Sequence, residues 1–206
     1  LMLLIIFNIS HGANHGELIK RYPKWFSLLS KKSYLLLGSS DKYWMKWHNI
    51  SHHQHTNTKN DIDANRSEPY FRLHKNIKFL KHYKFQHIYT FILNYPFTHL
   101  GVFVYNSKLT FLIYFLVNTL AAYFFSKRIN IIKCIFVESL VFGFLFVMIN
   151  HITHANNEVE YNHNYNGCWY ENQIRTTANF SCNNKFISHL FGGINHQIEH
   201  HLFQSV

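Results

Sequence analysis

The sequence predicts an all-α integral membrane protein: a transmembrane helical hairpin, flanking helices at the membrane interface and a histidine-rich helical cap on the cytoplasmic side. Three observations predict this fold. Two long apolar segments are separated only by residues 126–130. Histidines, seventeen among 206 residues, recur in clusters at helical spacing outside those segments. Basic residues are concentrated in the same polar stretches. The length suits a single domain over residues 1–206.

The two apolar segments are predicted to be membrane spans. Residues 109–125 carry no charge, and residues 131–149 carry only Lys133 and Glu138. Each is close to the ~20 apolar residues that cross the hydrocarbon core of a bilayer. Both are apolar around the whole helix, which favours spans over a pair of core helices in a soluble bundle. The short gap between them predicts a tight hairpin.

Three other apolar stretches are not predicted to cross the membrane in full. Residues 1–9 have the composition of the last turns of a span and lack the features of a signal peptide. Because the chain opens on Leu, we expect a fragment that lacks earlier membrane helices. Residues 25–38 are interrupted by two lysines and are predicted to lie at the interface. Residues 87–104 contain Pro96 and His99 and are predicted to form an interfacial or re-entrant helix.

The charge distribution predicts which side of the membrane the histidines occupy. A hairpin returns the chain to the side it left, so all histidine clusters fall on one side. Of the twenty Lys and Arg, only Lys127, Arg128 and Lys133 belong to the turn region of the hairpin. A basic excess marks the cytoplasmic face, so we expect a multi-pass protein with its clusters in the cytoplasm, in the endoplasmic reticulum if the source is eukaryotic. The net charge of +10 favours anionic membrane lipids or an acidic protein partner over nucleic acid, since no nucleic-acid module pattern is present.

Four groups of side chains have the spacing of neighbours on one helix face. The spacings are i and i+4, or i, i+3 and i+4, with one further ring turned by one residue in the second group. The groups are His11 and His15; His48, His52 and His53; Asn150 and His154; and Gln197, His200 and His201. One such group alone is common on protein surfaces. Four groups on one predicted side of a membrane point to a shared site.

Imidazole clusters of this size predict metal binding. A structural zinc site takes ~4 ligands, so these groups suit a pair of metal ions better than a single zinc. Neutral imidazole is compatible with iron, zinc and copper, and the count alone does not name the metal. No nucleophile triad, phosphate-binding loop or HExxH helix is present.

The order of the clusters resembles a known family. "HGANH", "HNISHH" and "QIEHH" resemble the three histidine boxes of the membrane fatty acid desaturases. "GGINHQIEHHLF", "HHQHTN" and "RTTANF" extend the similarity over nearly the whole chain. Glutamine in place of the first histidine of the third box resembles the front-end subgroup, which desaturates between an existing double bond and the carboxyl end.

The resemblance implies a non-haem di-iron oxygenase that uses O2 to remove hydrogen atoms from two adjacent acyl carbons. On this pattern the iron ligands are His11, His15, His48, His52, His53, His154, His200 and His201. Gln197 occupies a ligand position but is expected to bind weakly or through water, and Asn150 resembles a residue that holds an iron-bound water. His151 and His196 neighbour ligand positions and are candidates for orienting them. Trp169 and Tyr170 are candidates for bordering the acyl path.

The resemblance also implies partners and leaves alternatives open. The expected substrate is an acyl lipid or acyl-CoA, and the expected electron donor is a cytochrome b5-type or other carrier. The sequence shows no haem-binding motif of cytochrome b5, so we expect that domain either in a missing N-terminal part or in a separate protein. Gly12 and Gln204 depart from the family pattern, where Asp and Pro are frequent. A related hydroxylase or ketolase acting on lipid, sterol or carotenoid is one alternative. A membrane metal-binding protein is another, although that class places polar ligands within the spans.

Overall fold

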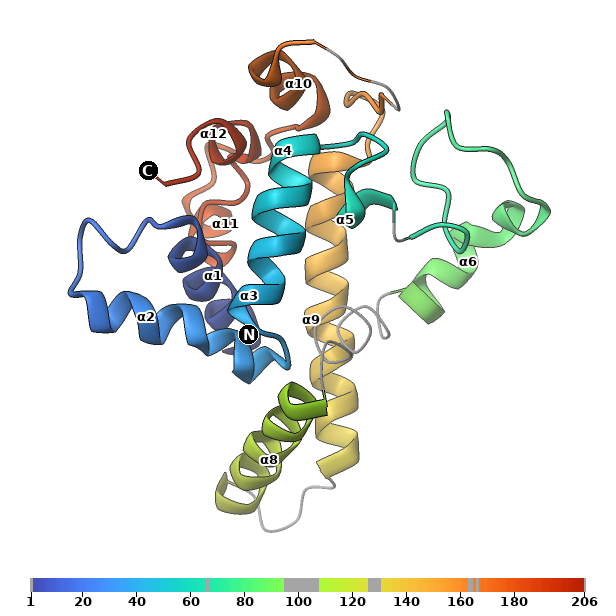
Figure 1. Ribbon diagram of the computed structural model, residues 1–206. Coiled ribbons are helices and arrows are strands. Elements are labelled where there is room, and N and C mark those ends of the chain that lie inside the picture. The colour runs from blue at the N-terminus through green and yellow to red at the C-terminus, as the bar shows by residue number, and fades with distance from the viewer. Residues whose placement is uncertain are drawn as a thin grey trace. The chain divides into compact units, whose positions relative to one another are not determined.

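The computed structural model describes residues 2–65, 67–94, 108–125, 131–162, 165 and 167–205 (Figure 1). Every regular element in these ranges is helical, which confirms the predicted all-α class for them. The chain divides into two compact units. Unit 1 comprises Leu1–Tyr43 and Phe91–Val147, and unit 2 comprises Trp44–Thr90 and Met148–Val206.

Unit 1 contains the apolar helices of the chain. Its elements are α1 (Met2–His15), α2 (Lys24–Lys32), the 3-10 helix η1 (Ser33–Leu37), α8 (Lys108–Phe125) and most of α9 (Ile131–His154). Two short elements cross its boundaries, namely α3 (Asp41–Trp44) and the π-helix η4 (Thr90–Asn94). The chain turns after η1 at Gly38, whose φ of 81° is a left-handed conformation that glycine adopts without a Cβ clash.

An aromatic core holds α1 in place in unit 1. The Phe7 ring meets the edges of Phe142 and Phe146 of α9, with ring centroids 6.0 and 5.3 Å apart. It also meets the Tyr34 ring of η1 at 6.5 Å and stacks on His11 at 5.4 Å. Edge-to-face rings at these separations stabilise a core beyond their buried area. Because Phe7 and His11 are one turn apart, this packing directs the second half of α1.

The predicted hairpin is represented by α8 and α9. α9 is long and apolar enough to cross a bilayer over Ile132–His154, with a mean hydropathy of 2.3 in its most apolar window. In α8 the apolar stretch Lys108–Ala121 is shorter than a full span. One such helix is weak evidence for a membrane protein, so the two-span hairpin stays a prediction. Residues 126–130 and 95–104, on which the turn and part of the interfacial segment were placed, lie outside the described residues.

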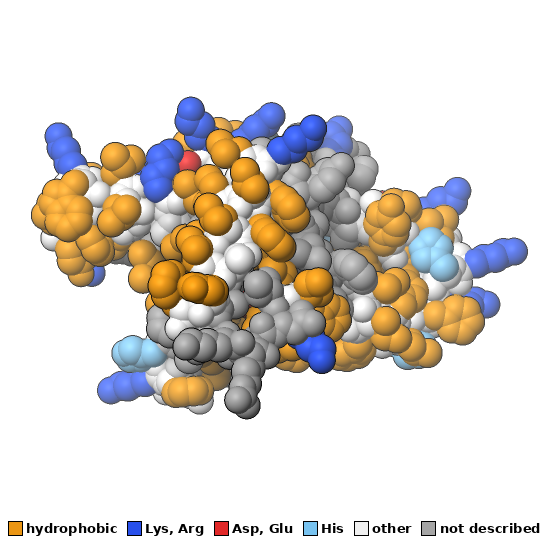
Figure 2. Space-filling model, turned by 90° about the horizontal axis from the view of Figure 1, so that it is seen from below, with side chains coloured by type: hydrophobic (Ala, Val, Ile, Leu, Met, Phe, Trp, Pro, Cys, Tyr) orange, Lys and Arg blue, Asp and Glu red, His pale blue; other side chains and the backbone are white. Residues whose placement is uncertain are grey.

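Both α8 and α9 expose large apolar side chains. Leu109 and Tyr123 of α8 and Ile132 of α9 are each more than half exposed. The predicted interfacial segment behaves similarly, since α2 exposes Trp25 and Leu29. Figure 2 shows hydrophobic side chains gathered over the face it presents, with lysine and arginine side chains at the margins. Exposed apolar surface on this scale is typical of a membrane or protein contact.

Unit 2 is built from short helices and the end of α9. Its elements are η2 (Met45–His52), α4 (His53–His55), α5 (Ile62–Asn65), η3 (Lys81–Phe85), α6 (Gln86–Tyr89), α10 (Trp169–Thr176), α11 (Lys185–Leu190) and α12 (Gln197–Leu202). η2 is a π-helix, and η3 is a 3-10 helix. Figure 1 shows η2 and α4 as one continuous helical run beside the C-terminal end of α9, and the His52 and His154 rings lie 4.7 Å apart between them.

Asn57 joins three segments of unit 2. Its side-chain amide donates to the backbone carbonyls of His154, Glu160 and Thr176 at 2.8, 3.2 and 3.3 Å. Asn57 is fully buried and has a φ of 53°, a left-handed conformation that asparagine tolerates better than most residues. Its position shortly after α4 therefore ties the segment after the second box to α9 and α10.

Candidate metal centre

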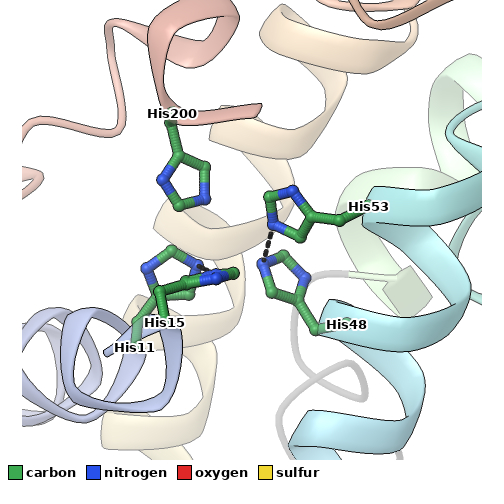
Figure 3. A group of neighbouring side chains, drawn as sticks. All are labelled: His11, His15, His48, His53 and His200. Carbon is green, nitrogen blue, oxygen red and sulfur yellow. Dashed lines mark hydrogen bonds between the residues drawn. The ribbon is translucent and has the colours of Figure 1, made fainter. Parts of the chain in front are cut away.

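The first histidine pair lies at the end of α1 in unit 1. The Nε2 atoms of His11 and His15 are 3.3 Å apart, and both side chains are buried (Figure 3). The predicted i, i+4 relationship is confirmed, since both residues belong to one continuous α-helix.

The second box lies on a π-helix instead of the expected α-helix. A π-helix forms i to i+5 hydrogen bonds, so residues five apart take the positions that residues four apart take in an α-helix. His48 and His53 accordingly face each other, with Nε2 atoms 3.1 Å apart (Figure 3). His52, which α-helical spacing pairs with His48, contributes its ligand nitrogen to a different group in unit 2. Single π-helical turns are frequent at functional sites.

Unit 2 brings six histidines into two groups of three. The ligand nitrogens of His48, His53 and His200 lie within 4.8 Å of one another. Those of His52, His154 and His201 lie within 4.8 Å of one another as well, and all three of these rings are buried. We call these the first and second triads.

The triads correct the predicted sharing of helix faces. The sequence spacing placed His48 with His52 and placed His200 with His201. In the structure each of these pairs is divided between the triads. In η2 the extra residue of the π-turn separates His48 from His52, and in α12 two consecutive residues point about 100° apart around a helix of ~3.6 residues per turn.

α12 is held at its start by a distant side chain. The Asn179 carbonyl oxygen accepts a hydrogen bond from the Ile198 backbone N–H at 2.8 Å. The Asn179 amide donates to Glu199 Oε2 at 2.7 Å. Because the first N–H groups of a helix have no partner within the helix, this contact fixes the short helix that carries both histidines of the third box.

Each ring of the second triad has a partner at Nδ1. Nδ1 of His52 lies 2.9 Å from Asp61 Oδ2, Nδ1 of His154 lies 3.2 Å from the Thr176 carbonyl, and Nδ1 of His201 lies 2.8 Å from Gln173 Oε1. Carboxylate and carbonyl oxygens only accept, so each Nδ1 carries the proton. The three Nε2 atoms therefore carry the lone pairs, and that of His154 lies 2.8 Å from the side-chain nitrogen of Gln197.

The burial and protonation of the second triad fit the binding of a metal ion. Nε2 of His201 is buried and has no hydrogen-bond partner in the part of the chain that the structure describes. Burial, followed by the neighbouring imidazoles, lowers the pKa of His201 well below its ordinary value. The ring is therefore neutral at pH 7, which is the form that binds metal. Three neutral imidazoles suit a divalent transition metal.

The remaining predicted site residues are placed as follows. The side-chain nitrogen of Gln197 lies 2.8 Å from Nε2 of His154, so Gln197 faces the second triad. Asn150 lies one turn before His154 on α9 and is half-buried. The Trp169 indole N–H donates to the His53 carbonyl at 3.0 Å, and Tyr170 is exposed. No described contact bears on an acyl path, so that role of Trp169 and Tyr170 stays a prediction.

Sequence reasoning missed the residues that orient the second triad. The Nδ1 partners of these three rings are Asp61, Gln173 and the Thr176 carbonyl, with the Thr56 hydroxyl 3.3 Å from Nδ1 of His201. The orienting role considered for His151 and His196 stays a prediction. Asp61 carried a usable signal, because it is one of only ten acidic residues and follows the second box closely. Gln173 carried a weaker one, since it lies just before the quoted stretch "RTTANF".

Comparison with known proteins identifies the family. The model of the fatty acid desaturase family matches residues 1–206. The chain belongs to the fatty acid desaturase family. The predicted resemblance is thus confirmed over the whole chain, and fatty acid desaturases are oxidoreductases of lipid metabolism.

Three curated desaturases are similar to the chain. It is 27% identical over 97% of its length to an acyl-lipid (8-3)-desaturase of Physcomitrium patens. It is 26% identical over 98% of its length to a probable Delta(5) fatty acid desaturase C of Dictyostelium discoideum, and 25% identical over 97% to an sn-1 linoleoyl-lipid 6-desaturase of Arthrospira platensis. The chain covers 48%, 52% and 62% of these desaturases, respectively. No solved structure matches the chain.

Proposed function

We propose that the chain carries the catalytic part of a front-end acyl desaturase, an enzyme that uses O2 and a non-haem di-iron centre to insert a double bond into an already unsaturated acyl chain. One observation carries this proposal. Two groups of three histidines lie in one small unit, and in the second group each ring is held by its Nδ1 atom, so that its lone pair lies on Nε2.

The proposed iron ligands are the histidines of the three boxes and His154. In unit 2 they are His48, His53 and His200, and His52, His154 and His201. His11 and His15 are proposed as further ligands because "HGANH" resembles the first histidine box. Gln197 is proposed as a weak or water-mediated ligand and Asn150 as the holder of a bound water. Iron would supply the activation of O2 that removal of hydrogen from an unreactive acyl carbon requires.

The protein's own residues perform three tasks in this mechanism. Asp61, Gln173 and the Thr176 carbonyl hold the protons of the second triad on Nδ1. Burial keeps the His201 ring neutral by lowering its pKa. Burial also excludes water from around these rings, which protects an oxidising site against side reactions.

Substrate and partners follow from the same proposal. The named relatives include desaturases of acyl lipids and of linoleoyl lipid, which supports an acyl-lipid substrate that already holds a double bond. Gln197 in the third box supports placement of the new bond on the carboxyl side. The electron donor is proposed to be a cytochrome b5-type carrier, drawn to the net positive charge of the chain. The site is proposed to face the cytoplasm, next to the predicted hairpin.

Metal content and lipid products test the proposal together. Expressed in a host that supplies unsaturated acyl lipids, the protein should hold about two irons per chain. The host lipids should gain a double bond on the carboxyl side of an existing one. His201→Ala should abolish the product and lower the iron content, whereas His55→Ala, at an exposed histidine of the same region, should do neither. Active protein without iron would refute the di-iron centre, and a product that retains oxygen would favour the hydroxylase alternative.

A further inference from the structure

Gln173 is a fully buried side chain in unit 2 that contacts two of the proposed ligand residues. It lies on α10, which contributes no histidine to either triad. Its Oε1 atom lies 2.8 Å from Nδ1 of His201, and its Nε2 atom lies 3.2 Å from the carbonyl oxygen of His53. His201 belongs to the second triad and His53 to the first.

The hydrogen bonds determine which way the Gln173 amide points. The His53 carbonyl can only accept, so it must face the NH2 group of Gln173. Oε1 then faces His201 and can only accept from it. Nδ1 of His201 must therefore carry the proton, and Nε2 must carry the lone pair. The backbone carbonyl of His53 thereby sets the tautomer of His201 through the Gln173 amide.

The surrounding contacts prevent Gln173 from relaxing to another position. The Thr56 hydroxyl donates to the same Oε1 atom at 2.8 Å, and its oxygen lies 3.3 Å from Nδ1 of His201, a longer contact than the 2.8 Å from Gln173. One turn earlier on α10, Trp169 donates to the same His53 carbonyl. The neighbouring Asn172 donates its side-chain N–H to the Thr56 carbonyl at 3.1 Å. These three side chains bind α10 along the end of the second box, and Gln173 is the one whose amide bonds to a triad ring.

We propose that Gln173 is a positioning residue of the metal centre: it holds His201 in the metal-binding tautomer and couples that ring to the backbone of His53. This inference rests on the proposed metal centre. The Nδ1 partner of His201 is the neutral amide of Gln173, whereas the Nδ1 partner of His52 in the same triad is the carboxylate of Asp61. An amide oxygen holds the proton on Nδ1 of the ring without adding a buried negative charge. It therefore sets the orientation and tautomer of the imidazole, and it raises the basicity of the ring less than a carboxylate does.

The test compares Gln173→Leu, Gln173→Glu and Asn172→Leu in the full chain. Asn172 is the matched control, because it lies on the same helix, is also buried and bonds to the backbone of the same segment. Gln173→Glu keeps an acceptor oxygen for His201. Co2+ serves as the probe metal, measured by titration and by its visible absorption bands. The nitrogen chemical shifts of His201 in the metal-free protein report the tautomer directly.

Gln173→Leu should weaken Co2+ binding at one site on the order of 10- to 100-fold, the usual effect of losing such an outer partner. It should also lose the pure Nδ1–H form of His201. Gln173→Glu should retain that form, and Asn172→Leu should retain both Co2+ binding and the tautomer. The inference is overturned if Gln173→Leu leaves the His201 tautomer unchanged, or if it weakens Co2+ binding no more than Asn172→Leu. Absence of Co2+ binding by the unmodified protein would instead refute the metal centre, and the nitrogen shifts would still decide the role of Gln173.

Discussion

Asp61 accepts a hydrogen bond from Nδ1 of His52 at 2.9 Å, and its carboxylate is completely buried. The same carboxylate accepts the backbone N–H groups of Asn57 and Ala64 at 2.8 and 3.1 Å. The turn that follows the second box therefore holds the Asp61 carboxylate in place, and the carboxylate in turn orients the His52 ring. Three hydrogen-bond donors stabilise the negative charge of a buried carboxylate. That charge in turn raises the basicity of the histidine the carboxylate contacts.

Asp61→Asn should weaken metal binding by about 10- to 100-fold, because the amide removes the negative charge behind His52. Titration of the purified protein with Fe2+ under anaerobic conditions measures this change. Asp63→Asn is the control, since Asp63 Oδ2 lies 3.6 Å from Nδ1 of His48 and is more exposed. Its effect should be smaller, and equal effects of the two variants would contradict the role given to Asp61.

Gln197→His should sharply reduce desaturation while leaving the metal bound at least as tightly. Imidazole is larger than the amide and a stronger metal ligand, and it would replace a group that lies 2.8 Å from Nε2 of His154. Fatty acid composition of expressing cells and iron content of the purified protein give the two readouts. Gln54→His, the same change at an exposed position beside the second box, should leave both unaltered. Full activity of Gln197→His would remove the special role of glutamine in the third box.

Acid should destabilise the metal-free protein through His74. This ring stacks on Tyr161 with centroids 4.5 Å apart, and burial lowers its pKa to about 4. An unfolded histidine takes up its proton near pH ~6.5. Between those values the unfolded chain binds more protons, so the free energy of unfolding should fall as pH falls from about 6.5 to about 4. Above that window His74 should contribute no pH dependence.

Urea unfolding of the metal-free protein at several pH values measures this dependence. His74→Phe keeps an aromatic ring against Tyr161 but cannot take up a proton. Its stability should therefore fall less steeply with acid, with a remaining slope from other buried histidines such as His201. Identical slopes for the variant and the unmodified protein would exclude His74 as a source of acid sensitivity.

The predicted hairpin has a simple topological test. Tags inserted near Asn60 and Asn157 should both be accessible from the cytosol, because an even number of crossings separates them. A tag near Ile129, in the segment outside the described residues, should be protected. Opposite accessibility of the first two tags would separate the second and third boxes and exclude the proposed site.

The long helices and the box histidines could be predicted because they depend on local pattern. α9 begins at the predicted residue and continues beyond the predicted span to His154, so this proposed ligand lies on the same helix as the predicted span. The pair His11 and His15 followed from ordinary α-helical spacing. In these cases neighbours in the sequence are neighbours in space.

The division of histidines into triads could not be predicted, because it depends on two features that spacing does not reveal. The π-turn that pairs His48 with His53 has no signature in composition. The partner Gln173 reaches its ring through tertiary packing, because it is 28 residues away from His201 in the chain. Spacing rules assume the period of an α-helix, and they predict neighbours only within one helix.

The π-helical turn between His48 and His53 also constrains how this segment can vary. Asn49 and Ile50 lie within it, and the interval between the two rings depends on the number of residues there. Removal of one residue there would shorten the interval between the two rings from five to four and rotate every later residue of the box to a different side. The segment is therefore closed to insertion and deletion, and its length matters to the proposed site as much as its histidines do.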